Sequence, residues 1–161
     1  MYEFVLFIHS WLRWVISIFL ILVLFRSISG WRQKTPYAKK DKVLGGILVG
    51  FTHLQLIIGL VLYFALSPIT HSALNNMGFA MKNASLRFWA VEHIFTMLIF
   101  VVLVQLGRTL SKRSKDEVKK HKTVAIYTGI AVLVLIAGMP WSFRKEIGRP
   151  LFMDFQTKAQ Q

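Results

Sequence analysis

Several polar side chains lie within or at the ends of long apolar segments, where burying a polar group in a membrane is costly in free energy. They are His9, Arg13, His53, Gln55, Glu92, His93 and His121. Imidazole is a common metal ligand, and histidines from two membrane helices can supply both axial ligands of a haem iron. The chain contains no cysteine, so disulfides, thiolate metal sites, iron–sulfur clusters and cysteine nucleophiles are excluded.

Two of the histidines are expected at matching depth. His9 and His93 each lie about five residues below the external end of their segments, or roughly 8 Å at the rise of an α-helix. In a four-helix bundle of alternating direction, the first and third helices can lie diagonally and run parallel, so two imidazoles can approach a flat cofactor from opposite sides. His9 and His93 are therefore the first predicted ligand pair for haem b. His53 and His121 lie on the other diagonal and form a possible second pair, although their depths match poorly.

Arg13 lies one helical turn from His9 and shares its face. It could bind a haem propionate through charge-assisted hydrogen bonds. Alternatively, Arg13 pairs with Glu92 and both charges are neutralised in the low-dielectric interior. Gln55 and Glu92 could also tune an imidazole or serve a quinone or proton path.

The histidines also have explanations that need no ligand. Hydrogen bonds between membrane helices produce the same pattern of polar residues. His121 is flanked by lysines, so a solvated lysine-rich face is nearly as good an interpretation of it as ligation. Gly46, Gly50 and His53 share one helix face, which predicts that His53 turns toward a closely packed neighbour.

The elements that must position these residues are four apolar segments at about residues 4–25, 43–66, 88–106 and 124–141. Each is near the ~20 residues that cross ~30 Å of hydrocarbon. Of the 161 residues, 55% are hydrophobic and 17% are charged. We expect an all-α, polytopic membrane protein, a single domain over residues 1–161 with a polar tail at 142–161. The first segment is too long for a signal peptide and lacks its basic start and cleavage site, so we expect it to remain.

The formal net charge of +13 is unevenly distributed along the chain. Lysines and arginines concentrate at residues 26–42 and 108–122, whereas the middle connection at 67–87 holds only Lys82 and Arg87. Basic connections stay in the cytoplasm, which predicts an up-down-up-down bundle with both termini outside the cytoplasm. We attribute the basic charge to this topology and to anionic lipids, and expect no nucleic-acid partner.

Other chemistries fit the sequence poorly. Glu92 is the only carboxylate within the apolar segments, so paired acid–base catalysis has no second group there. Glycine-rich phosphate loops and the zinc-protease signature are absent. A transporter or channel would favour discontinuous helices or a ring of like charges, and neither is evident.

Short motifs in a set order along the chain resemble a known group of proteins. They are His9-Ser-Trp-Leu-Arg13-Trp14, His53-Leu-Gln55, Gly59-Leu-Val-Leu-Tyr63, Arg87-Phe88, Glu92-His93, His121-Lys122 and Ala137-Gly-Met-Pro-Trp141. In order and placement they resemble the short four-helix bacterial membrane proteins labelled "cytochrome b". The resemblance spans nearly the whole chain. It implies b-type haem bound by His9, His53, His93 and His121, with a role in membrane electron transfer.

The predicted function is that of a small b-type cytochrome in a bacterial inner membrane, with one or two haems. It would relay electrons between a quinol or redox protein and a partner complex in a respiratory chain, as a carrier rather than a stand-alone enzyme. The alternative is a cofactor-free accessory subunit that packs against a larger membrane complex. In that case residues 144–161 would be a docking segment, and Arg13 and Glu92 an internal ion pair.

Overall fold

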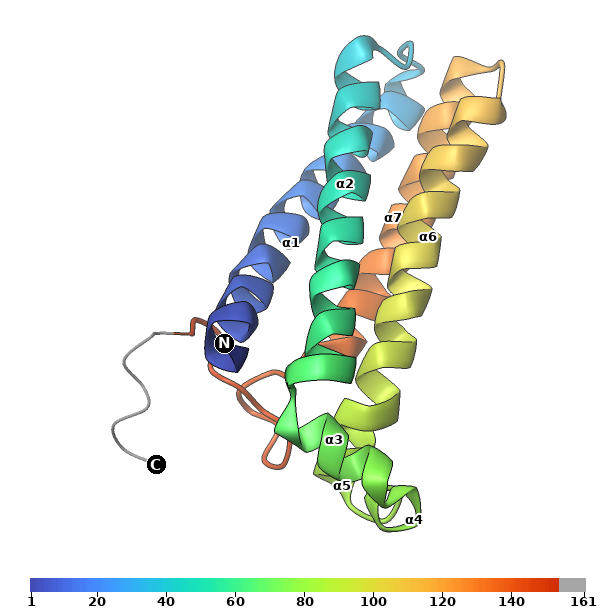
Figure 1. Ribbon diagram of the computed structural model, residues 1–161. Coiled ribbons are helices and arrows are strands. Elements are labelled where there is room, and N and C mark those ends of the chain that lie inside the picture. The colour runs from blue at the N-terminus through green and yellow to red at the C-terminus, as the bar shows by residue number, and fades with distance from the viewer. Residues whose placement is uncertain (154–161) are drawn as a thin grey trace.

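The computed structural model describes residues 1–153, and throughout that range its regular structure is helical. Four long helices form a bundle (Figure 1). They are α1 (Tyr2–Gln33), α2 (Lys39–Val61), α6 (His93–Arg113) and α7 (Glu117–Gly138). A π-helical turn η1 (Leu62–Leu66) extends α2, and a second, η2 (Phe88–Glu92), precedes α6. Three short helices join them: α3 (Pro68–Asn75), α4 (Met77–Ala80) and α5 (Ala84–Arg87).

Four helical spans are long and apolar enough to cross a membrane. Their outward surfaces carry large apolar side chains, such as Phe25, Ile57, Phe95 and Leu133, each at least 60% exposed. A water-soluble protein rarely exposes so much apolar surface, whereas lipid tails solvate it well. The prediction of an all-α fold with four membrane-length helices is confirmed.

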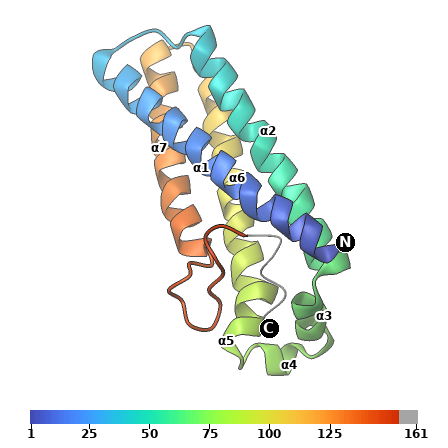
Figure 2. The ribbon, with the colours of Figure 1, turned by 90° about the vertical axis from the view of Figure 1, so that its left-hand side faces the viewer.

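The helices pack in a ring in the order α1, α2, α6 and α7, and α7 returns to contact α1 (Figures 1 and 2). As a result α1 lies diagonally across from α6, and α2 lies across from α7. The core between them is built from Ile16, Leu20, Leu48, Phe100 and Val104, each at most 4% exposed. The helices that carry His9 and His93, α1 and α6, are therefore the diagonal pair that the sequence predicts.

The helices extend past the bounds that hydropathy predicts. The first continues to Gln33 instead of residue 25, and the second begins at Lys39 instead of 43. The third continues to Arg113, and the fourth begins at Glu117. Lysine and arginine are good helix formers, so the backbone stays helical where the apolar pattern stops. Of the predicted polar tail, residues 154–161 lie outside the described part of the chain.

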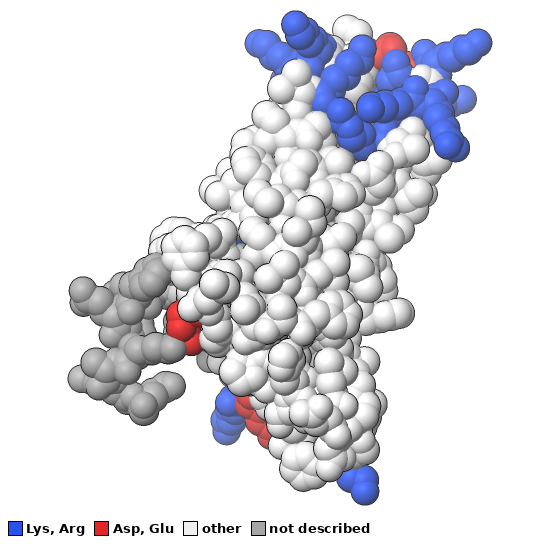
Figure 3. Space-filling model, viewed as in Figure 1, with Lys and Arg blue, Asp and Glu red and all other residues white. Residues whose placement is uncertain are grey.

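The connections at 34–38 and 114–116 lie at one end of the bundle, where lysine and arginine side chains gather (Figure 3). Asp41 holds this end together. Its carboxylate accepts hydrogen bonds from the Arg26 guanidinium at 2.8 and 3.0 Å and from the Ala38 backbone N–H at 2.9 Å. The Tyr37 backbone N–H donates to the Glu117 carboxylate at 3.0 Å. These bonds cap α2 and fasten the first connection to α7.

Candidate functional site

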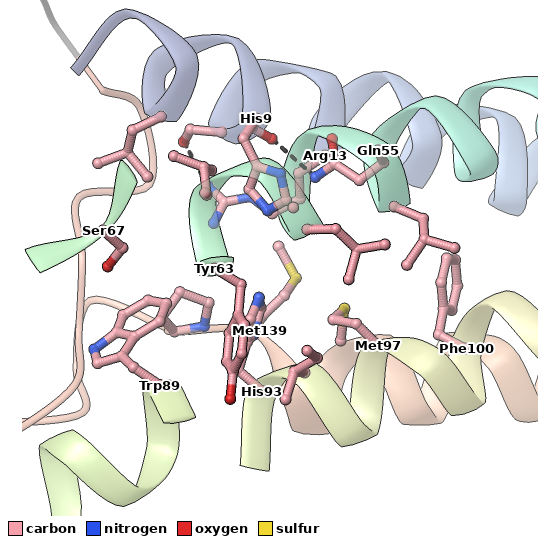
Figure 4. A pocket seen from close by; sticks show the side chains of 18 of the residues that line it. His9, Arg13, Gln55, Tyr63, Ser67, Trp89, His93, Met97, Phe100 and Met139 are labelled. Atoms are coloured by element: carbon pink, nitrogen blue, oxygen red, sulfur yellow. Dashed lines mark hydrogen bonds between the residues drawn. The ribbon is translucent and has the colours of Figure 1, made fainter. Parts of the chain in front are cut away.

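A cavity of about 150 Å³ lies among the helices (Figure 4). It is lined by residues of the first part of α1, the last part of α2 and the first part of α6, away from the basic connections. His9 and Arg13 reach it from α1, and Gln55 reaches it from α2. His93 lines it from α6, and Arg149 lines it from the segment that follows α7. The structure thus brings together three of the predicted site residues, His9, Arg13 and His93.

His9 lies against α2 at a glycine. A Cβ atom on Gly59 would stand 3.2 Å from His9 Cε1, so the absence of a side chain there gives the imidazole its room. Gln55 Nε2 donates a hydrogen bond to the His9 backbone carbonyl at 2.9 Å and fixes the helix pair locally. His9 Nδ1 is buried and has no hydrogen-bond partner within residues 1–153.

His93 is oriented by its neighbours. Its Nδ1 lies 2.9 Å from the Gly138 carbonyl oxygen, at the end of α7. A carbonyl only accepts, so Nδ1 carries the proton and Nε2 keeps its lone pair in the neutral ring. The rings of Trp89 and Phe88 flank the imidazole, with centroids 5.5 and 5.7 Å away. Metal-binding histidines are commonly held in this way, with one nitrogen bonded to a carbonyl and the other left for the metal.

Four buried polar atoms on the cavity-lining residues lack hydrogen-bond partners. They are His9 Nδ1, Arg13 Nε, Thr52 Oγ1 and Gln55 Oε1. Leaving a buried polar atom unpaired costs about 1–3 kcal/mol, and native proteins avoid it. In the described part of the chain, the one other such side-chain atom is His121 Nδ1. Four of the five unpaired buried side-chain atoms in the described chain therefore lie on residues that line this one cavity.

The segment after α7 folds back to lie against α1 and borders the cavity (Figure 2). Arg13 Nη2 and Trp14 Nε1 both donate to the Leu151 carbonyl, each at 2.9 Å. The Phe152 ring stacks on Trp14 with centroids 5.4 Å apart, and Met153 lines the cavity. Up to residue 153, the predicted polar tail is therefore a packed closing segment.

The predicted ion pair between Arg13 and Glu92 is wrong. Glu92 Oε1 instead accepts from Arg87 Nε at 2.7 Å, and both side chains are about 40% exposed. The cause is the π turn η2, because its wider helix brings residues five apart onto one face. Arg13 donates to Ser10 Oγ at 3.5 Å and to the Leu151 carbonyl instead.

His53 lies outside this cavity. Its Nδ1 lies 2.8 Å from the Val49 carbonyl in the preceding turn of α2. A Cβ on the neighbouring Gly50 would meet no atom within 4 Å among the described residues. Within the described chain, the predicted close packing of this face is present at Gly46, where a Cβ would stand 3.1 Å from the Arg108 guanidinium, and is not present at Gly50.

His121 is separated from both the cavity and His53. It is 1% exposed, so its interpretation as part of a solvated lysine-rich face is wrong. Its ring meets Tyr37 edge-on, with centroids 4.8 Å apart, and packs against Gly30 of α1. The structure thus does not bring His53 and His121 together.

Sequence reasoning missed several residues that line the cavity: Tyr2, Thr52, Tyr63, Trp89 and Arg149. Tyr63 and Trp89 lie on the two π turns, which the Tyr63 hydroxyl links by donating to the Ala90 carbonyl at 2.7 Å. No local pattern marks π turns, although they occur often at functional sites. Thr52 had a usable signal, because it lies one turn before Gln55 on the face of α2 that contacts α1.

Within residues 1–153 no three histidine or carboxylate side chains are grouped to hold a metal ion. A haem needs only two axial ligands from the protein, since its porphyrin supplies the others. Comparisons with protein-family models, curated proteins and solved structures each gave no match to this chain.

Proposed function

We propose that this chain is a small b-type membrane cytochrome in which His9 and His93 would hold the iron of one haem. One observation carries the proposal: two histidines from diagonal helices line a single cavity whose walls also hold four unpartnered buried polar atoms. The resemblance to the short bacterial "cytochrome b" proteins supports the same interpretation.

The residues present fit a haem. His93 Nε2 is available to a metal, because the Gly138 carbonyl accepts from the other ring nitrogen. His9 Nδ1 has no hydrogen-bond partner among the described residues, so no bond to it would have to break. Arg13 lines the same cavity and suits a propionate. Apolar side chains such as Leu56 and Ile94 complete the lining and suit the porphyrin ring. When bound, the haem would supply one-electron chemistry, while the protein holds and orients it and sets the polarity around it.

One haem fits the structure better than two. His53 is half-buried and bonded within its own helix, whereas His121 is enclosed by Tyr37 and Gly30. Neither residue lines the cavity that holds His9 and His93. We therefore assign a packing role to His121 and leave His53 outside the site.

The orientation in the membrane follows from charge. The basic end would face the cytoplasm of a bacterial cell (Figure 3), which gives an up-down-up-down bundle with both termini outside. The cavity then lies toward the external face of the inner membrane. A quinol in the bilayer or a redox protein on that side could exchange electrons with it, in contact with other membrane redox subunits.

The test is a reduced-minus-oxidised absorbance spectrum of the purified protein, with haem quantified as the pyridine haemochrome. We expect about one haem per chain, with the spectrum of a six-coordinate bis-histidine haem. His9→Ala and His93→Ala should lose it, whereas His53→Ala, a matched histidine in the bundle, should keep it. A well-folded protein without haem, from cells supplied with haem, would refute the proposal and favour the cofactor-free accessory subunit.

A further inference from the structure

Two arginines from different parts of the chain border the same cavity. Arg13 comes from α1 and Arg149 from the closing segment after α7. The closing segment carries Arg149 and also contacts Arg13, because Arg13 donates to the carbonyl of Leu151, two residues after Arg149 in the sequence. The Arg149 guanidinium stands 4.4 Å from the centroid of the Trp89 ring and within 3.5 Å of the Tyr2 hydroxyl.

No carboxylate balances these two charges in the part of the chain that the structure describes. The Asp41, Glu92 and Glu117 carboxylates pair with Arg26, Arg87 and Lys120, and none of these residues lines the cavity. Among residues 1–153, neither an aspartate nor a glutamate lines the cavity. An uncompensated cation in a partly apolar site is costly, and it becomes favourable when a bound anion pairs with it.

We propose that Arg149 is a second anion-binding residue of this cavity, and that Arg13 and Arg149 together bind two carboxylates of one occupant. The inference rests on the proposed function: if the occupant is haem, the carboxylates are its two propionates. The closing segment then does more than cover the site. It carries one of the two charges that select a diacid, so haem binding and docking of residues 140–153 against α1 are coupled.

The experiment compares haem with its dimethyl ester, which keeps the iron and ring but lacks both acids. Apoprotein in detergent is titrated with each porphyrin and binding is followed by absorbance. A hydrogen bond to a charged group changes affinity by about ten- to a hundredfold, so we expect the wild type to prefer haem by at least tenfold. Arg149→Gln should lose much of that preference by weakening haem and leaving the ester unchanged, whereas Arg149→Lys should keep most of it.

Arg144→Gln is the matched control. Arg144 belongs to the same segment and stands 5.0 Å from the Phe88 ring, but it does not line the cavity. The Arg144→Gln protein should prefer haem over the dimethyl ester by the same factor as the wild type does. Equal wild-type affinity for haem and ester, or undiminished preference in Arg149→Gln, would overturn the inference while the haem proposal stands. Failure of the wild type to bind either porphyrin would remove the proposed function and the inference with it.

Discussion

A methyl group added at Gly30 tests how α1 packs against α7. An alanine Cβ there would stand 2.5 Å from His121 Nε2 and 2.6 Å from Nδ1. Real Cβ atoms do not come this close to another atom, so something must move. The His121 ring is 1% exposed and is bounded by Tyr37 on another side, so it has no open space to enter.

Whether Gly30→Ala raises or lowers the free energy of unfolding tells this close packing apart from an effect of helix propensity alone. Alanine is favoured over glycine inside a helix by about 1 kcal/mol, so an uncrowded Gly30→Ala would gain stability. Overpacking a filled core costs about 1–3 kcal/mol. We expect the clash to dominate, with a net loss of about 1–2 kcal/mol. Gly50→Ala is the control, because a Cβ there meets nothing within 4 Å and the variant should be as stable as the wild type or more so.

The assay is denaturant unfolding in detergent micelles, followed by circular dichroism and tryptophan fluorescence. Gly30→Ala should unfold at a lower midpoint than the wild type, and Gly50→Ala should not. Adding His121→Ala to Gly30→Ala should cost less than the two single effects combined, because the methyl group then has room. A Gly30→Ala protein as stable as Gly50→Ala would refute this placement of His121, and loss of haem in a folded His121→Ala protein would refute the packing role assigned to it.

Three further predictions test other parts of the structure. His93→Ala should abolish the absorbance of a bound haem whereas His53→Ala should leave it intact, as measured by haem content per chain. Asp41→Ala should lower the unfolding free energy by about 1–2 kcal/mol, because a helix cap and bonds to Arg26 are lost; denaturation in detergent would show this, and an unchanged midpoint would contradict it. Burial raises the pKa of the Tyr37 hydroxyl. The resulting contribution of Tyr37 to the free energy of unfolding is therefore complete at neutral pH, and it is lost as the pH rises past the ordinary tyrosine pKa of about 10. Tyr37→Phe should flatten that alkaline loss in a series of unfolding curves against pH.

The sequence was informative wherever local spacing decides the structure. Long apolar runs have one stable arrangement in a membrane, so four helices could be predicted from composition alone. The four-residue spacing of His9 and Arg13 placed both on one face, and equal depth in parallel helices brought His9 and His93 to the same cavity. Whether they bind haem stays a prediction.

What could not be predicted depends on contacts between distant segments or on the backbone. An ion pair between Glu92 and Arg13 was predicted on the assumption of regular helical geometry. The π turn η2 instead places Glu92 next to Arg87, with which it forms its ion pair. His121 lies among lysines in the sequence, yet Gly30 and Tyr37 enclose it from another part of the chain. Neither a π turn nor a contact across the bundle leaves a signal in nearby residues.

The contrast between the two ends of the bundle argues against loose packing as the origin of the cavity. At the basic end the buried Asp41 carboxylate accepts three hydrogen bonds, and His121 Nδ1 is the one buried polar side-chain atom there, among the described residues, that stays unpaired. At the other end four buried polar atoms stay unpaired around one cavity, each costing about 1–3 kcal/mol. Departures from polar satisfaction are expected mainly at functional sites. The closing segment holds Arg13 through the Leu151 carbonyl, and the four unpaired atoms lie on residues of the cavity lining, which is where the proposed haem would bind.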